Sequence, residues 1–530
     1  MSIEKKYSLV LLVLTVVLFF FGLGWRDFWA PVEPRYAEIA RIMFDHNEWI
    51  VPRVNGELYT DKPILYFWLV LLAAKSFGGV NEWAVRLPAA LGGIGFVWLT
   101  YLFGKEFFSA RAGLLAAVVL ATSIRVIWEA RWAHIDMLFC FFFIVSIYFF
   151  ARALFDRGSP KQALIAYVCM ALATLAKGLI GVVLPGLLLL SFLIARRDWK
   201  ILALARLPEG IALFIIVSAP WLVAVSYATG GQWLNDFLWV HHFERFTGGT
   251  GHRQPFYYYL TTLPVDLLPW TILAVPALLA YRPYTRIWRE PVLLFFVLWF
   301  FAVFLFFSAS DTKRELYLLP LLPVIALLIG NYLNDLSTGA ISEPDNFRWF
   351  GSANFAILAV AGFSSLAVTW IIRREAFWWF APGGVILAAG AALTAHFFWR
   401  REPLKAVQGG VATMTLLLIS AVLWVFPYLE NFKSRRPLSA EIRKVVPDSA
   451  PLYIYADAMH DFNFYLQREV VAVLSSPSEI ENLLRAKRTS YVLVKNRDLK
   501  RLNRIARQWV VLTGSTGSTT WNLVEVKPAR

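Results

Sequence analysis

Long apolar runs separated by short charged connections fill most of the chain. Thirteen of these runs approach the roughly 20 residues that an α-helix needs to cross a bilayer. They lie near residues 8–24, 85–103, 112–130, 134–151, 162–176, 178–195, 210–227, 260–280, 291–308, 315–332, 353–372, 378–398 and 408–427. The pattern predicts a polytopic α-helical membrane protein with about thirteen transmembrane helices.

The pattern changes near residue 430, where long apolar runs give way to short segments. LYIYADA, VVAVLSS, SYVLVKN, WVVLTGS and TWNLVEV are predicted as strands, and LSAEIRKVV and SEIENLLRAKR as helices. Strands that alternate with helices are typical of an α/β domain. We therefore divide the chain into a membrane domain, 1–429, and a soluble α/β domain, 430–530.

Basic residues gather in alternate connections between the predicted spans. Cytoplasmic loops are enriched in Lys and Arg, so this pattern predicts a cytoplasmic N-terminus. The soluble domain and the segment 25–84 then lie on the opposite side. Lys5 and Lys6 before the first apolar run resemble the start of a signal peptide, but no small-residue cleavage site follows, and we expect a retained anchor.

The segment 25–84 is dense in charged and aromatic residues. Within it, VEPRYAEIARIMF places Glu33, Glu38 and Arg41 near helical spacing, with Pro34 in the first turn. This spacing predicts an amphipathic helix that lies on the bilayer. A solvated connector with an interfacial belt of aromatic residues is the alternative.

Composition narrows the classes of function. Hydrophobic residues make up 58% of the chain and the mean hydropathy is +0.57, which excludes a soluble globular protein. A net charge of +15 could indicate nucleic acid as a partner. The basic residues, however, lie mainly in short loops, which is typical of membrane topology and of contact with anionic lipid. Cys140 and Cys169 both lie in apolar runs and provide no disulfide framework.

Two ionisable residues fall where a membrane makes charge costly. Asp136 opens an apolar run and Lys177 lies between two such runs, so each is a functional candidate. The structural alternative for Asp136 is a first-turn carboxylate that the helix dipole favours. For Lys177 it is a lysine that extends its amine to the membrane surface.

The connections on the non-cytoplasmic side carry cations that run against the positive-inside rule, and an anionic ligand would explain them. Guanidinium groups bind phosphate oxygens in pairs, and an ammonium group acts as a compact charge. Surface ion pairs are the alternative for each cation. The candidate phosphate-binding residues are Arg35, Lys62, Arg245, Lys313 and Arg314.

Carboxylates and cations at a membrane surface, facing a compartment normally without nucleoside triphosphates, favour a lipid-phosphate-linked sugar donor. Phosphate would leave, the cations would stabilise its developing charge, and one carboxylate would deprotonate an acceptor hydroxyl. A transporter is the alternative. Transporters commonly show paired repeats and broken helices, whereas no repeat is evident here and the charges cluster at one interface.

Several segments resemble a known family. EPRYAEIARIM, the EWIVP run and Asp61-Lys62-Pro63 are similar to the first periplasmic loop of the bacterial aminoarabinose transferases and the related protein O-mannosyltransferases. The Asp136 helix, WVHHFERF, GHRQPFYYYL and residues 308–317 follow in the family's order. The resemblance implies a GT-C glycosyltransferase of the bacterial inner membrane, with thirteen spans and a periplasmic C-terminal domain. It also implies an inverting reaction that uses a polyprenyl (undecaprenyl) phosphate sugar.

The resemblance further implies roles for particular residues. The family usually has an aspartate, a candidate catalytic base, directly before the loop's glutamate, but Val32 stands at that position here. The catalytic candidates are therefore Glu33 and Asp136. Asp61 and His242 would lie near a divalent metal ion that could be structural, and no other cofactor is expected. The donor-binding set would comprise Arg35, Tyr36, Lys62, Arg245, Lys313, Arg314 and Tyr317.

The acceptor is open between two branches of the family. The DKP, WVHHFERF and HRQPFYYYL segments are nearer the aminoarabinose branch, which favours lipid A, lipopolysaccharide or another envelope glycolipid. Transfer to protein hydroxyls is the alternative. The expected partners are thus a polyprenyl-phosphate sugar donor, an envelope acceptor and membrane lipids, and no nucleic acid.

Overall fold

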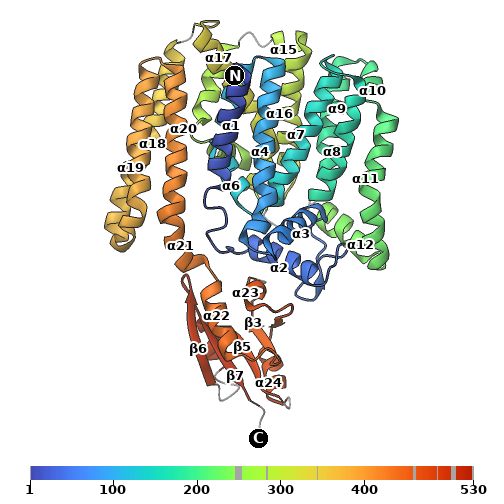
Figure 1. Ribbon diagram of the computed structural model, residues 1–530, viewed down its shortest axis with the longest axis vertical. Helices are drawn as coiled ribbons and strands as arrows, with labels where there is room; N and C mark the ends of the chain where they lie inside the picture. Colours follow the sequence, from blue (N-terminus) through green and yellow to red (C-terminus); the bar gives the residue numbers. More distant parts are fainter. Residues whose placement is uncertain are drawn as a thin grey trace. The chain divides into compact units, whose positions relative to one another are not determined.

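The chain folds into two compact units (Figure 1). The computed structural model describes residues 2–244, 253–281, 285–342, 344–457, 461–485, 488–502 and 509–527. The first unit comprises Met1–Leu23, Thr60–Tyr66 and Arg86–Val425, and the second comprises Gly24–Tyr59, Phe67–Val85 and Phe426–Arg530. The second unit therefore joins most of the first loop to the C-terminal region. The domain boundary expected at 429/430 stays a prediction, since composition alone defined it.

The first unit is helical. Every one of the thirteen predicted spans coincides with a helix or with a pair of helices joined at a bend. Its helices are α1 Ile3–Phe20, α4 Glu82–Phe107, α5 Ala110–Ala121, α6 Ile124–Arg131, α7 Ile135–Leu154, α8 Ala163–Lys177, α9 Ile180–Arg196, α10 Lys200–Leu204, α11 Leu207–Ala228, α12 Gln232–Leu238, α13 Tyr258–Asp266, α14 Ala274–Ala280, α15 Thr285–Arg289, α16 Pro291–Ala309, α17 Leu322–Thr338, α18 Pro344–Ile372, α19 Phe377–Trp399 and α20 Pro403–Ser420. Short 3₁₀ and π segments join some of them: η1 Pro160–Gln162, η2 Trp239–Glu244, η3 Thr271–Leu273, η4 Glu315–Leu321, η5 Arg374–Ala376 and η6 Ala421–Val425.

Fewer than thirteen of the described helices are long and apolar enough to count as membrane spans. Within the described ranges, eight helices are long and apolar enough, or up to ten if each bent pair counts as one span. The three predicted spans outside this set are α1, which carries Glu4, Lys5 and Lys6 in its first turn, and the short α8 and α9 of 15 and 17 residues. A multi-pass helical membrane fold is thus confirmed, while the count of thirteen stays a prediction.

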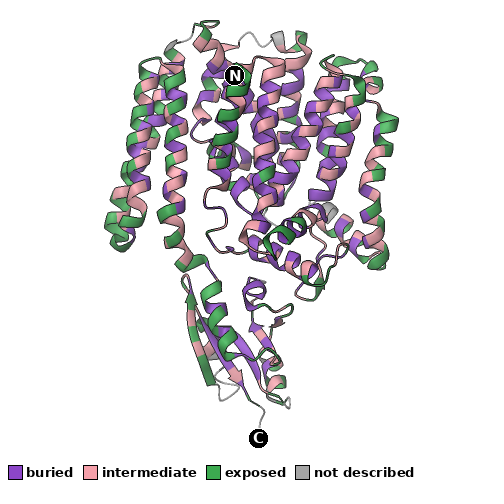
Figure 2. Cartoon of the chain, viewed as in Figure 1, coloured by how far each residue is buried: buried purple, intermediate pink, exposed green. Residues whose placement is uncertain are grey.

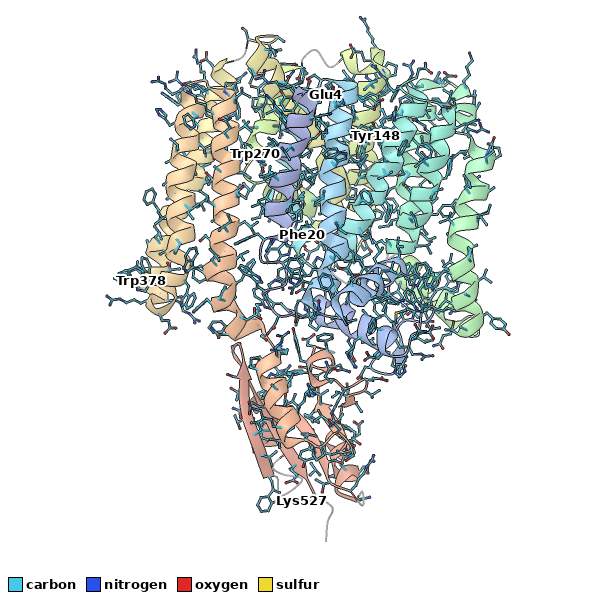
Figure 3. The ribbon with its side chains drawn as sticks, viewed as in Figure 1. Glu4, Phe20, Tyr148, Trp270, Trp378 and Lys527 are labelled. Carbon is cyan, nitrogen blue, oxygen red and sulfur yellow. The ribbon has the colours of Figure 1, made fainter. Side chains whose placement is uncertain are left out.

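Burial separates inner from outer helices of this unit (Figure 2). α7 and the η4–α17 segment bury most of their side chains, whereas α11, α18 and α19 leave most of theirs uncovered. Trp270 is fully buried and its indole N–H donates to Thr122 Oγ1 at 2.9 Å, while Trp378, 74% exposed, projects from the first turn of α19 (Figure 3). Large apolar side chains on the outer helices are expected of a protein whose solvent there is lipid.

A bend between α5 and α6 sets the direction of α6, which carries charged residues near the candidate site. The two helices meet at 66°. Thr122 and Ser123 end α5, and their hydroxyls donate to the carbonyls of Val118 and Val119, each at 2.7 Å. Such side-chain bonds to the preceding turn offer the backbone an alternative to a continuous helix. α6 consequently leaves the axis of α5 and carries a charged face, with its arginines and Glu129 outside the apolar run.

The second unit contains two parts of the chain far apart in sequence. From the first loop come α2 Val32–Asp45, β1 Arg53–Val54, β2 Glu57–Leu58 and most of α3 Leu65–Phe77. From the C-terminal region come α21 Phe426–Lys433, α22 Arg436–Val445, β3 Leu452–Tyr455, α23 Asn463–Leu466, β4 Ala472–Leu474, α24 Pro477–Arg485, β5 Ser490–Lys495, α25 Asn496–Leu502, β6 Trp509–Thr516 and β7 Thr519–Val526. The amphipathic helix predicted around Pro34 is confirmed as α2, with Pro34 in its first turn.

The C-terminal strands form one mixed sheet in the order β4-β3-β5-β7-β6. β3 pairs in parallel with β4 and β5, and β7 pairs antiparallel with β5 and β6. Alternate residues of β5 face opposite sides: Leu493 joins a core with Leu438 and Ile442 of α22, whereas Val492 joins a core with Ile480 of α24. The α/β class expected from this part of the sequence is confirmed.

Hydrogen bonds tie the first loop to the C-terminal region within this unit. The Asn55 side-chain oxygen accepts from Asn463 Nδ2 at 2.9 Å and from the Val471 backbone N–H at 2.8 Å. The Phe28 N–H donates to Tyr465 Oη at 2.6 Å, and the Phe28 and Phe464 rings meet edge to face at 5.1 Å. The loop is therefore part of a folded body rather than a flexible connector.

A glycine substitution should test the close helix packing of the first unit. A Cβ added at Gly330 in α17 would lie 2.4 Å from the backbone nitrogen of Ala116 in α5, so Gly330→Ala must force the two helices apart. We expect a loss of about 1–3 kcal/mol, measured as a lower melting temperature in detergent. The matched control is Gly186→Ala in α9, where the added Cβ meets no described atom within 4 Å. Equal melting temperatures for the two variants would contradict the packing described here.

Candidate active site

Glu33 lies in the first turn of α2 and is held by a buried arginine. Its side chain is 0% exposed. Arg26 Nη1 donates to Glu33 Oε2 at 2.5 Å and Arg26 Nη2 donates to Oε1 at 2.9 Å, while the Trp29 N–H donates to Oε2 at 3.1 Å. The arginine and the backbone N–H together hold both carboxylate oxygens of Glu33 in place. The arrangement makes Glu33 an anchor for the start of α2, and its catalytic assignment stays a prediction.

Arg35 and Tyr36 follow on the same helix beside aromatic rings. The Arg35 guanidinium carbon lies 5.8 Å from the Tyr36 ring centroid and 5.9 Å from that of Tyr59. Tyr36 in turn packs edge to face against Tyr59 and Phe67, with centroids at 6.4 and 5.7 Å. Aromatic faces stabilise a guanidinium group while leaving its N–H edge able to bind an oxyanion. The structure thus brings together two predicted donor-binding residues, Arg35 and Tyr36.

Two buried carboxyl groups of the second unit have raised pKa values. Burial raises the pKa of Glu38 even though Arg41 donates to both of its oxygens, at 2.9 and 2.7 Å. Burial likewise raises the pKa of Asp461 to about 6, against the opposing charges of Arg435 and Arg35. Arg35 is therefore close enough to Asp461 to act on it electrostatically. Asp461 thus contributes to the charge around the predicted phosphate-binding arginine, and Glu38 to that around Arg41.

Lys62 and Asp61 form a second cluster, in the first unit. Lys62 Nζ lies 3.0 Å from Asp61 Oδ1, and His241 Nδ1 lies 3.5 Å from the same oxygen. The other nitrogen of His241, Nε2, is 3.1 Å from Thr60 Oγ1. The histidine that contacts Asp61 is therefore His241, the neighbour of the predicted His242, whose side chain lies outside the described residues together with Arg245.

Of the two predicted metal ligands, Asp61 and His242, the structure describes the side chain of Asp61. Asp61 and His241 supply one carboxylate and one imidazole, both suitable ligands for a divalent ion. Among the described side chains, no group of three His, Cys, Asp or Glu could hold a metal ion. The Asp61 and His242 site consequently stays a prediction, and no chemical step is derived from it.

Asp136 and Lys177 form a buried ion pair at the ends of two membrane helices. Asp136 lies in the first turn of α7 and Lys177 is the last residue of α8, with 2.5 Å between Lys177 Nζ and Asp136 Oδ1. Lys177 Nζ also lies 4.9 Å from the Tyr317 ring centroid, and the charge of Arg314 acts on Asp136. The structure therefore gathers three predicted site residues, Asp136, Arg314 and Tyr317, around Lys177.

Lys313 does not join this group through its amine. Its Nζ donates to the carbonyls of Gln254, at 3.3 Å, and Ser310. Arg253 and Thr312 form a backbone bridge next to it. Lys313 thus fastens the segment before η4 to the segment before α13, and its role in donor binding stays a prediction.

A network around Arg125 was not predicted. Arg125 Nε donates to Asp266 Oδ1 at 2.7 Å, and its Nη1 lies 3.3 Å from Glu129 Oε1. Glu129 Oε2 lies 2.6 Å from Nδ1 of His134, which stands two residues before Asp136. Asp266 is the last residue of α13. In the sequence it is a single acidic residue that follows a tyrosine-rich segment. Nothing in the sequence predicts that Asp266 contacts Arg125. Arg125 lies on the bent helix pair α5–α6 and Asp266 on the bent pair α13–α14, and the sequence does not show these bends.

The ion pair of Asp136 with Lys177 can be tested by a double-mutant cycle. Lys177→Met should cost about 3–5 kcal/mol because it leaves Asp136 charged and unpaired next to apolar helices. The double variant Asp136→Leu with Lys177→Met should recover most of that loss, measured by melting temperature in detergent. Exposed Lys161→Met is the control. If Lys177→Met alone melts like the wild type, Lys177 merely extends to the membrane surface.

The chain is similar to known proteins over most of its length. Residues 61–223 match the family model described as dolichyl-phosphate-mannose-protein mannosyltransferase. The undecaprenyl phosphate-α-4-amino-4-deoxy-L-arabinose arabinosyl transferase of Shewanella sediminis is 28% identical over 506 residues, covering 90% of this chain and 88% of that protein. The protein of the same name from Pseudomonas aeruginosa is 30% identical over 419 residues, covering 77% of this chain and 73% of that protein.

Solved structures share the fold. The crystal structure of ArnT from Cupriavidus metallidurans bound to undecaprenyl phosphate has a TM-score of 0.81 at 21% identity and covers 99% of this chain and 100% of its own. The archaeal oligosaccharyltransferase AglB from Archaeoglobus fulgidus, in complex with an inhibitory peptide and a dolichol-phosphate, has a TM-score of 0.52 at 12% identity and covers 94% of this chain and 70% of its own. With this fold and the sequence identities above, the chain belongs to the family of the undecaprenyl phosphate-aminoarabinose arabinosyl transferases, which are membrane glycosyltransferases of the GT-C fold.

Proposed function

We propose that this enzyme transfers a sugar from undecaprenyl phosphate to an envelope glycolipid such as lipid A. The observation that carries the proposal is 28% identity over 90% of the chain with a protein named undecaprenyl phosphate-aminoarabinose arabinosyl transferase. The Asp136, Lys177 and Tyr317 cluster supports it, because it combines a carboxylate, a cation and an aromatic ring at the ends of membrane helices. Those groups suit the binding of a sugar phosphate at a membrane surface.

The proposed topology has thirteen spans in the inner membrane, a cytoplasmic N-terminus, and the first loop and C-terminal domain in the periplasm. The alternation of Lys- and Arg-rich connections supports this orientation. It also gives a reason for the short α8 and α9. They meet at Lys177 and Gly178, so an ionised group is placed at the end of a span rather than in its middle.

The phosphate of the donor is the leaving group in the proposed reaction. The acceptor oxygen attacks the anomeric carbon, the bond from that carbon to the phosphate oxygen breaks, and undecaprenyl phosphate is released with inversion. Cations stabilise the charge that develops on the phosphate. We assign this role to Arg35 and Lys62 as principal groups. Tyr36, Arg245, Lys313, Arg314 and Tyr317 are the further proposed donor-binding residues.

Asp136 is the preferred catalytic carboxylate. Its side chain is 13% exposed, and Lys177 Nζ lies 2.5 Å from its Oδ1. In the proposed reaction, Oδ2 takes the proton of the acceptor hydroxyl. Glu33 is less suited, because Arg26 and Trp29 occupy both of its oxygens. Lys177 would keep Asp136 ionised and hold its orientation before the proton is transferred.

Transfer to protein hydroxyls is the second candidate function. The match of residues 61–223 to the mannosyltransferase family model favours it, and both reactions would share the donor chemistry above.

A transfer assay tests the two candidate functions. Purified protein mixed with undecaprenyl-phosphate aminoarabinose and lipid A should release undecaprenyl phosphate together with glycosylated lipid A, and mass spectrometry measures both products. Release that requires a polypeptide acceptor instead would favour the second candidate. Absence of binding to any polyprenyl phosphate would refute both.

Arg35→Ala should reduce kcat/KM for the donor by about 10²-fold or more, because a charge-assisted contact to phosphate is lost. Because the Arg35 guanidinium also packs near two tyrosine rings, the melting temperature is measured alongside and kcat/KM is compared per folded molecule. The matched control is Arg53→Ala, an exposed arginine of the same loop. Wild-type kcat/KM in Arg35→Ala would remove the phosphate-binding role.

Asp136→Asn should lower kcat by about 10²- to 10⁴-fold, the range expected for loss of a general base, with little change in KM for the donor. Glu33→Gln should instead lower the melting temperature, since it weakens the pair with Arg26, and leave turnover per folded molecule within severalfold. An unchanged kcat in Asp136→Asn would mean that the acceptor oxygen is already ionised, as in a phosphate group.

A further inference from the structure

A polar pocket of about 350 Å³ opens in the second unit, and none of the predicted catalytic, donor-binding or metal residues that the structure describes lines it. It is formed by the segment before α4, by α22 and by α23. Its polar lining consists of Asn81, Glu82, Arg436, Arg443 and Gln467. Ligand pockets usually span about 300–1,000 Å³, so this one has room for a small polar group such as a sugar ring with a phosphate.

Arg436 is held in place at the wall of this pocket. Its Nε donates to Asp27 Oδ1 at 3.0 Å, its Nη2 pairs with Glu82 Oε1, and its guanidinium carbon lies 5.0 Å from the Tyr465 ring centroid. The side chain is nevertheless 51% exposed. A guanidinium group fixed on one side and open on the other loses little freedom when it binds an anion.

Further hydrogen-bonding groups of the lining are not used by the described part of the chain. Asn81 Oδ1 accepts from the Ala84 N–H at 3.0 Å, which leaves its Nδ2 available. Gln467 Nε2 donates to the Phe464 carbonyl at 2.8 Å, which leaves its Oε1 available. Arg443, exposed on α22, has no ion-pair or hydrogen-bond partner among the described residues. Two cations, an amide donor and an amide acceptor therefore line the same pocket.

The pocket adjoins the point where the chain enters a membrane helix. Asn81 directly precedes α4, and Glu82 is its first residue; α4 is one of the helices long and apolar enough to cross a bilayer. A ligand bound here can thus remain attached to a lipid whose acyl chains stay in the membrane. The headgroup chemistry that fits the lining is a sugar carrying hydroxyl groups and an anionic substituent.

We infer that this pocket binds the phosphorylated sugar headgroup of the acceptor glycolipid, with Arg436 and Arg443 on the phosphate and Asn81 and Gln467 on the sugar. Paired guanidinium groups suit a phosphate, and amide side chains exchange hydrogen bonds with hydroxyl groups in both directions. Asp27 and Glu82 orient Arg436 and balance its charge, so Arg443 supplies the positive charge of the lining that no described carboxylate pairs. The inference rests on the glycolipid acceptor proposed above.

Charge reversal at Arg443 tests the inference directly. In the full-length protein, Arg443→Glu should raise the KM for lipid A by about tenfold or more, with the change in the acceptor KM rather than in the donor KM. Ala440→Trp, which fills the pocket from the exposed side of α22, should act in the same direction. The matched control is Arg485→Glu, the same charge change on exposed residue Arg485 of α24, which should behave as wild type.

Binding without turnover separates this inference from the proposed function. Phosphatidylcholine vesicles containing lipid A should bind the wild type more strongly than Arg443→Glu, whether or not any sugar is transferred. Vesicles containing phosphatidylglycerol should bind both proteins alike, because they offer a phosphate without the sugar. Free inorganic phosphate should not compete with lipid A at equal concentration.

Three outcomes would overturn the inference. An unchanged KM and unchanged lipid A binding in both Arg443→Glu and Ala440→Trp would exclude the pocket as an acceptor site. Equal loss of lipid A and phosphatidylglycerol binding in Arg443→Glu would reduce it to a general anionic-lipid contact, and strong competition by inorganic phosphate would reduce it to a phosphate site. Failure of the wild type to transfer sugar while these binding differences persist would instead refute the proposed function alone.

Discussion

Charge beside a membrane has to be paired, and that constraint explains most of the polar contacts in this protein. An ionised side chain next to hydrocarbon is costly unless an opposite charge lies against it. Asp136 meets Lys177 at 2.5 Å, Arg26 meets Glu33 at 2.5 Å, and Arg125 meets Asp266 at 2.7 Å. Breaking such a pair leaves one buried charge alone, which costs more than the pair itself contributes. Each pair therefore fixes the end of a helix or the start of a loop.

The same constraint explains which features the sequence could predict. A span of apolar residues must satisfy its backbone within a helix, so the positions of the thirteen runs and of the helices agree. The five short segments predicted as strands after residue 430 coincide with the five strands of the C-terminal sheet. The short helices α23 and α25 were not predicted, since four and seven residues show too little periodicity.

Pairings between distant residues could not be predicted from the sequence. Arg26 lies seven residues before Glu33, and helical spacing gives no reason to join them, because α2 begins only at Val32. His241, which lies in the π segment Trp239–Glu244, contacts Asp61, and nothing in the spacing of the two residues along the chain predicts that contact. The amino-acid composition also does not predict that the first loop folds together with the C-terminal region. It depends on single hydrogen bonds such as those of Asn55 to Asn463 and Val471.

Val32 fits the charge pattern at the start of α2. An aspartate there would add a second carboxylate beside Glu33, which Arg26 pairs through both of its oxygens. The N-terminal end of a helix carries a partial positive charge that adds to the charge of Arg35. A valine at this position thus removes a candidate base but also removes repulsion of a phosphate near Arg35. In the proposed reaction the base role then falls to Asp136 or is not needed because the acceptor is ionised, and the cations stabilise the leaving group.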